Sequence, residues 1–143
     1  MHKALNTKDK LCKFGISVHD TCEVCGSETE TAPHMFFACV YSSRVLHLVC
    51  GLIGESIPAD ATTDWRRGLR GSGIRNDFIN AIINACIYGI WKQQNLCKHE
   101  LTLINPMKLS KQIVKEVTYR TLSSKEILGV RDRDWLEGLR NCA

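Results

Sequence analysis

The sequence has few aromatic residues and few prolines, and it has no long hydrophobic run. Aromatic residues make up 7% of the 143 residues, which leaves few rings for stacking on bases, and there are 3 prolines. The most apolar run covers residues 78–91, which is too short for a membrane span because that needs about twenty residues. No apolar segment near the N-terminus has the character of a secretory signal. We therefore expect an intracellular chain, nuclear or cytoplasmic, with reduced thiols.

The motifs of the common enzyme classes are also missing. The sequence has no aromatic-x-Asp-Asp turn for the two metal ions of a polymerase. It has no Gly-rich phosphate loop, no Gly-x-Ser-x-Gly elbow and no His-Glu-x-x-His helix. The acidic cluster at residues 132–134 alternates with arginine and is typical of a solvated charged segment. We predict that the chain is not an enzyme on its own and has no small-molecule substrate.

Positive charge is absent from one segment and concentrated on either side of it. Residues 20–43 contain four acidic residues and no lysine or arginine, although the whole chain has a formal charge of +4. The flanking basic residues are Lys8, Lys10 and Lys13 before this segment, and Arg66, Arg67, Arg70 and Arg75 after it, interleaved with glycines. Phosphate contacts, to RNA more than to DNA, are expected from these two groups. The alternative is that both are solvated surface segments. The acidic segment between them, which includes Glu28 and Glu30, is interpreted as a solvated surface turn.

The acidic segment contains the most informative motif of the chain. Cys22, Cys25, His34 and Cys39 form a Cys-x2-Cys-x8-His-x4-Cys pattern, which supplies four soft ligands to a tetrahedral zinc ion. Gly26 gives the first pair the backbone freedom of a tight turn, and the second pair fits a helical turn. Because the protein fills all four positions, the pattern predicts one structural zinc ion and no catalytic metal.

The remaining thiols and histidines have a simpler interpretation. The other cysteines show no pairing pattern, and two of them lie in apolar runs, so they are expected to be small buried hydrophobic residues: Cys12, Cys50, Cys86, Cys97 and Cys142. A disulfide framework is the alternative for a chain with 8 cysteines. His19 is the nearest substitute ligand for zinc, and it is weaker than His34.

The motif resembles the zinc-binding domain found downstream of the polymerase in reverse transcriptases of plant LINE-type non-LTR retrotransposons. The residues that carry the resemblance are 5–11, 14–16, 22–26, 30–31, 34–39 and 42–46, about the first third of the chain. A weaker match covers residues 90–95. Leu46 stands where that family usually has tryptophan, and Gln94 where it commonly has arginine. The resemblance implies a role connected with nucleic acid.

Hydrophobic periodicity predicts a mainly α-helical fold, in which a small structural zinc knuckle precedes a bundle-like C-terminal part. A short helix is expected over residues 8–14, with Leu11 and Phe14 facing inward, and further helices are expected after Ser42, over 78–91, after Pro106 and in the tail from residue 124. Pro58 is expected to close the helix that follows Ser42. In the helix after Pro106, the apolar residues at intervals of four are Leu109, Ile113 and Val117. The predicted organisation is a zinc-binding domain at 1–54, a linker with an Arg/Gly-rich stretch at 55–75, and a helical region at 76–143.

The predicted helix over residues 78–91 is apolar on all sides except for two asparagines. Such a helix must be covered on every side, either as a core helix or by another copy of the chain. The candidate oligomer interface consists of Asn80, Ile83, Asn84 and Ile87, since buried asparagines fix register between helices. The alternative is that the asparagines face water.

These observations predict a non-catalytic zinc-binding module of retroelement origin that binds nucleic acid, RNA rather than DNA. A module for protein interaction or self-assembly, built on the helix at 78–91, is the alternative, and a membrane-associated oligomer is a weaker one. A fragment of a larger reverse transcriptase and a separately expressed relic both fit the sequence.

Overall fold

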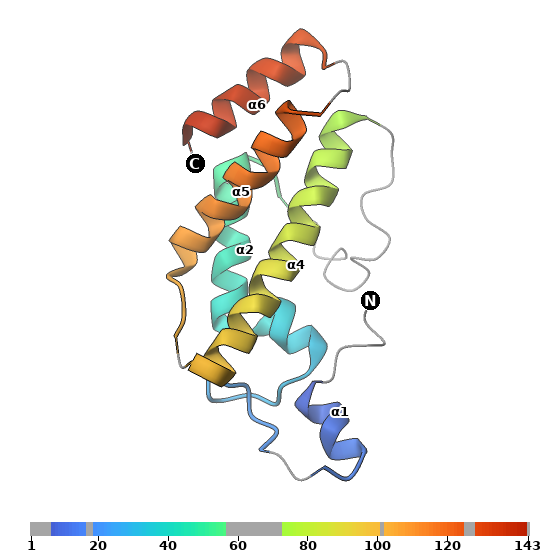
Figure 1. Cartoon of the computed structure of the whole chain (residues 1–143), viewed down its shortest axis with the longest axis vertical. Helices are drawn as coiled ribbons and strands as arrows, with labels where there is room; N and C mark the ends of the chain where they lie inside the picture. Colours follow the sequence, from blue (N-terminus) through green and yellow to red (C-terminus); the bar gives the residue numbers. More distant parts are fainter. Residues whose placement is uncertain (1–6, 17–18, 57–72, 101, 125–127, 143) are drawn as a thin grey trace.

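The computed structural model describes residues 7–16, 19–56, 73–100, 102–124 and 128–142, and this part of the chain is predominantly helical (Figure 1). The elements in order are α1 (Lys8–Lys13), the π-helix η2 (His34–Ala38), α2 (Val40–Ile53), α4 (Ile74–Glu100), α5 (Pro106–Leu122) and α6 (Val130–Cys142). Within the described residues, extended pairing is limited to one bridge between Thr21 and Thr29. The predicted fold class, helices that follow a Cys/His cluster near the N-terminus, is confirmed.

α5 lies at the centre of the helical part. It packs against α2, α4 and α6, and α6 lies across its C-terminal end (Figure 1). The predicted apolar row of Leu109, Ile113 and Val117 is buried, as is a second row formed by Ser110, Val114 and Thr118. Two adjacent rows give α5 a face wide enough to contact helices on both sides.

Local sequence accounts for the ends of α2 and α5. The Asn105 side chain accepts a hydrogen bond from the Met107 amide at 2.9 Å, and Pro106 occupies the first turn, where a missing amide costs nothing. α2 ends at Gly54, whose φ of 69° lies in the left-handed region that glycine adopts easily. Pro58, expected to close this segment, lies outside the described residues.

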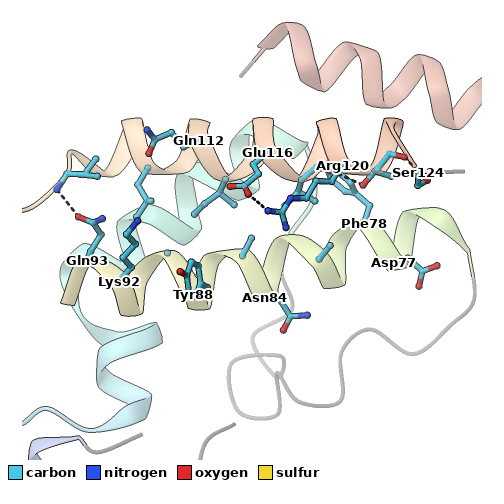
Figure 2. Close-up of a pocket in the computed structure, with 18 of the residues that line it drawn as sticks. Asp77, Phe78, Asn84, Tyr88, Lys92, Gln93, Gln112, Glu116, Arg120 and Ser124 are labelled. Carbon is cyan, nitrogen blue, oxygen red and sulfur yellow. Dashed lines mark hydrogen bonds and ion pairs between the residues drawn. The ribbon is translucent and has the colours of Figure 1, made fainter. Parts of the chain in front are cut away.

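α4 is longer than the apolar run that predicted it, and it is apolar on one side only. The helix has 27 residues, and its buried face continues past the apolar run to Gln93 and Gln94. Gln93 tolerates burial because its Oε1 accepts a hydrogen bond from the Ile104 amide at 3.0 Å (Figure 2). On the other side, Tyr88 is 60% exposed and Asn84 is exposed. A single copy of the chain therefore leaves this side of α4 uncovered, and its coverage by a second copy stays a prediction.

α1 differs from the expectation in the orientation of its apolar residues. Phe14, predicted to face inward, is 75% exposed, and Leu11 is half-buried. The reason is that α1 is attached to the metal-binding end by polar contacts: Lys8 Nζ donates to the Thr21 carbonyl at 2.7 Å, and the Asp9 amide donates to the Glu30 carbonyl at 3.4 Å. A helix held in this way needs no buried ring.

The buried apolar residues form one cluster that runs from Cys22 to Leu139 and so joins the metal loop to α6. Most of the predicted linker lies outside the described residues, and the division at residues 54 and 75 stays a prediction. None of the helices in the described part combines the length and hydrophobicity that a membrane span requires.

Candidate metal centre

The first pair of candidate ligands lies in a tight turn. The Thr21–Thr29 bridge brings the two sides of the loop together, and the Cys22 amide donates to the Glu28 carbonyl at 2.7 Å. Inside the loop, the Gly26 amide donates to the Cys22 carbonyl at 2.8 Å, and Gly26 has a φ of 67°. This left-handed conformation is the reason that the turn needs glycine directly after Cys25.

The second pair lies at the two ends of a π-helical turn. The Cys39 amide donates to the His34 carbonyl at 2.7 Å, five residues back along the chain. An α-helical turn pairs residues four apart, whereas the x4 spacing of the motif places His34 and Cys39 five apart, which is the interval of a π-helix. The turn is therefore helical, as predicted, but with the wider period that the spacing demands.

The four side chains converge on one point. Cys22 Sγ lies 4.0 Å from Cys39 Sγ, and Cys25 Sγ lies 3.3 Å from His34 Nε2. All four ligand atoms lie within 4.8 Å of one another. The edges of a tetrahedral zinc site with these ligands are about 3.4–3.8 Å long, so the cluster needs only a small contraction to coordinate the ion.

Burial makes this a closed site. Cys22, Cys39 and His34 are buried and Cys25 is half-buried. A zinc ion held by three thiolates and one imidazole has a complete tetrahedral shell, with no position for water or substrate. The residues fit a structural zinc ion, as predicted.

Hydrogen bonds prepare Cys22 to bind as a thiolate. The Cys39 thiol, and then the amides of Cys25 and Val24, lower the pKa of Cys22 to about 4, although burial opposes the shift. Its neighbour shows the opposite effect: the pKa of Cys39 is raised because this thiol holds the proton that the two sulfurs share. A metal ion takes the place of that proton, since a coordinating thiol is deprotonated outright.

Hydrogen bonds also shift the pKa values of the other two ligands, Cys25 and His34. Although partial burial acts against it, hydrogen bonds from the Ser27 side chain and from the Ser27 and Glu28 amides lower the pKa of Cys25. Burial favours the neutral His34 ring, but the hydrogen bonds to Cys22 and Cys25 outweigh it and raise the pKa of His34. Because zinc binds the neutral ring, protons compete with the metal at His34, and zinc affinity depends on pH.

One face of α4 closes the site from the helical side. Gln94 places its amide against the metal ligand, with Oε1 3.9 Å and Nε2 4.0 Å from Cys22 Sγ. Cys97 Sγ donates to the Glu23 carbonyl at 3.7 Å, and Lys98 Nζ lies 2.7 Å from Glu30 Oε1. Sequence reasoning missed these three α4 residues. The spacing of Gln94, Cys97 and Lys98, three and four residues apart on one helical face, was the available indication.

Glu30 was expected to be a solvated acid of the metal loop, and this expectation was wrong. The residue is 0% exposed, and only Oε1 has a partner. Glu30 Oε2 is buried with no hydrogen bond in the described part of the chain. The charge is tolerated because Lys98 neutralises it, which joins the metal loop to α4 through an ion pair. Glu28, two residues earlier, is exposed as expected.

The basic residues predicted to contact phosphate have different environments. Lys8, 11% exposed, contacts Glu23 Oε1 at 2.5 Å, and Lys13 contacts Asp9 at 3.5 Å, so both already bind carboxylates of the chain. Lys10 is half-buried. Arg75 pairs with Glu55 at 3.1 Å and lies 4.8 Å above the ring of Trp135. Arg66, Arg67 and Arg70 lie outside the described residues.

The remaining predicted site residues are dispersed. His19 is exposed and is not part of the ligand cluster. None of the five cysteines outside the motif forms a disulfide among the described residues. Cys86 is buried as expected, but Cys12 and Cys142 are exposed. In the candidate oligomer interface, Ile83 is already buried in the core, Ile87 and Asn80 are half-buried, and Asn84 is exposed.

Comparison with known families agrees with the geometry. Residues 1–45 match the family described as zinc-binding in reverse transcriptase. The matched segment includes all four candidate ligands, and the family it matches is a zinc-binding module and not a catalytic domain. The comparisons with curated proteins and with solved structures gave no match.

Proposed function

We propose that the chain is a non-catalytic, zinc-stabilised accessory module of a LINE-type reverse transcriptase and that it binds RNA. The observation that supports the proposal is the match of residues 1–45 to a zinc-binding family of reverse transcriptases, together with the compact cluster of three cysteines and one histidine. Because four protein ligands leave no open position on zinc, the metal holds the fold and RNA contacts must lie elsewhere.

The outer face of α5 is the surface best suited to RNA. Lys108, Lys111, Lys115 and Tyr119 recur every three or four residues, so they form one exposed stripe along the helix. None of the ion pairs between described residues involves these three lysines. Tyr119 is 67% exposed. Ammonium groups for phosphate and an exposed ring for stacking are the two elements that single-stranded RNA binding uses.

The metal loop is less suited to this role. Its exposed charged residues include Glu23 and Glu28, and residues 20–43 contain no lysine or arginine. The nearest basic side chain, Lys8, is held by Glu23 and by the Thr21 carbonyl. A loop with this charge repels phosphate, so the proposal assigns RNA to α5 and structural support to the zinc site.

A salt-dependent titration tests the proposal. The zinc-loaded full chain is titrated into labelled single-stranded RNA at several salt concentrations, and binding is followed by fluorescence anisotropy. We expect affinity to fall with salt. The combined Lys108→Gln, Lys111→Gln and Lys115→Gln variant should lower the slope of log K against log salt by about 2, since each lost contact with a single strand removes about 0.7.

A second variant with the same loss of charge serves as the control. Arg131, Arg133 and Arg140 are exposed on α6, and their replacement by glutamine removes three positive charges from another surface. The α6 variant should keep the wild-type slope. An equal loss in both variants would show a response to net charge only, and absence of binding at low salt would refute the proposal.

A further inference from the structure

The side of α4 that faces away from the core carries a row of exposed residues. Asp77, Ala81, Asn84, Tyr88 and Lys92 follow one another at intervals of four, three, four and four residues, and all five are exposed. Figure 2 labels Asp77, Asn84, Tyr88 and Lys92 along α4, with Gln112, Glu116 and Arg120 on the neighbouring α5. Between the two helices runs an open groove of about 780 Å³, lined at its apolar base by Ala85, Gly89, Leu109 and Ile113. We call the five-residue row the α4 stripe.

The α4 stripe has opposite charges at its two ends. Asp77 lies in the first turn of α4 and Lys92 lies fifteen residues later, about 22 Å along the helix axis. No ion pair between described residues involves either side chain. The stripe is neutral overall, so it does not suit a phosphate backbone, in contrast to the lysine-rich face of α5.

The residues on either side of one point in the α4 stripe are complementary in charge and in side-chain size. The midpoint between Asp77 and Lys92 falls between Asn84 and Ala85. A two-fold axis at this point places Asp77 opposite Lys92 of a second copy and Ala81 opposite Tyr88 of that copy. An acid then faces a base and a small side chain faces a large one, twice each, which is the self-complementarity that an isologous interface requires.

We propose that two copies of the chain form a dimer through antiparallel pairing of their α4 stripes about this axis. The partner's α4 covers the groove and the exposed ring of Tyr88, which lies 6.1 Å from the ring of Trp91. The interface uses the exposed side of α4, whereas Ile83, expected from sequence to form it, belongs to the core of each copy. The inference does not depend on RNA binding.

Charge exchange between two single variants tests the register. In sedimentation equilibrium, the zinc-loaded wild-type chain of 16.1 kDa should approach twice this mass as its concentration rises. Asp77→Lys and Lys92→Asp should each raise the dissociation constant at least about tenfold, because each reversal puts like charges together at both ends of the interface. An equimolar mixture of the two variants should associate again, since every contact between unlike variants then joins opposite charges.

Two further variants make the result decisive. Lys111→Asp makes the same change of charge as Lys92→Asp on the outer face of α5 and should leave the dissociation constant unchanged. Tyr88→Ala removes the ring without altering charge, so it tests the pairing even if Asp77→Lys lowers the helix content seen by circular dichroism. We expect Tyr88→Ala to weaken the dimer by a similar factor.

Several results would overturn the proposal. These are a wild-type chain that stays monomeric at low salt and high concentration, a mixture of the reversed variants that does not associate, and a loss in Lys111→Asp equal to that in Lys92→Asp. A Tyr88→Ala chain with unchanged mass and weaker RNA binding would assign the α4 stripe to RNA instead.

Discussion

The metal-binding end and the helical part of the molecule are stabilised by different means. Between residues 19 and 39 the chain has one β-bridge, a series of turns and the single turn of η2, and the feature that these share is the set of four ligands. α2, α4 and α5 instead bury rows of aliphatic side chains against one another. The first region depends on a metal ion for its geometry, and the second depends on apolar burial.

The two regions meet through apolar and polar contacts. Met35 and Phe36 of η2 are buried in the common core, which is an apolar connection. The contacts of Gln94 with Cys22 and of Lys98 with Glu30 are polar. A polar connection is specific in geometry but gives little net free energy, so we expect the turn that holds Cys22 and Cys25 to depend on the metal.

Metal removal should separate the two regions most strongly. We expect chelation of zinc to unfold residues 19–39 while α2, α4 and α5 keep most of their helical signal, because structural zinc supplies about 10–16 kcal/mol to small sites at neutral pH. Amide hydrogen exchange with and without chelator measures this directly. Cys25→Ser should lose zinc and give the same pattern. Loss of protection throughout α5 would show that the regions are one cooperative unit.

Acid should reproduce the effect of the chelator. The pKa of Cys22 is lowered from 9.0 to about 4 in the folded chain, so the stabilisation that comes from its thiolate is complete above pH 9 and is lost as the pH falls toward about 4. Protons also compete with zinc at His34, whose pKa is raised. Zinc release, followed with a metal indicator, should therefore occur on the acid side of neutrality.

Loss of the ion pair between Lys98 and Glu30 should have the next largest effect on stability. Lys98→Met leaves the Glu30 carboxylate buried without its partner, and we expect a loss of about 2–3 kcal/mol in the free energy of unfolding, reduced from the value for a fully buried pair because Lys98 is partly exposed. Urea denaturation of the zinc-loaded chain measures it. Lys111→Met, an exposed lysine on α5, is the control and should change stability little.

A double variant sharpens this test. Glu30→Gln together with Lys98→Met removes the buried charge as well as its partner. The double variant should therefore lose less free energy of unfolding than the sum of the losses in the two single variants. Additive losses would show that the ion pair does not connect the two regions.

The sequence predicted the parts of this structure that depend on short spacings. The four ligands follow from their intervals and from the glycine after Cys25, and the row of Leu109, Ile113 and Val117 follows from a period near four. The contacts between the regions join residues about 70 positions apart, as in Cys22 and Gln94, and no local pattern encodes which helix face meets the metal loop.

The errors have the same origin. The burial of Glu30 depends on Lys98, 68 residues away, and the exposure of Phe14 depends on how α1 is attached to the metal loop. Charge alone therefore predicted a solvated Glu30, and hydrophobicity alone predicted a buried Phe14. Tertiary contacts decided both.

The smallest effect is expected inside the helical part, at the close approach of α4 and α5. A β-carbon on Gly89 would lie 3.2 Å from Ile113 Cδ1 and 3.4 Å from Leu109 Cδ1. Gly89→Ala gains about 1 kcal/mol of helix propensity and loses a similar amount to crowding, so its net effect on stability should be under about 1 kcal/mol. In an Ile113→Val background, which lacks Cδ1, the same change should become stabilising. Urea denaturation midpoints of the wild type, the two single variants and the double variant give the coupling energy between positions 89 and 113. Zinc affinity should be the same in all four proteins. Equal effects of Gly89→Ala in both backgrounds would show that this contact does not limit the packing of the two helices.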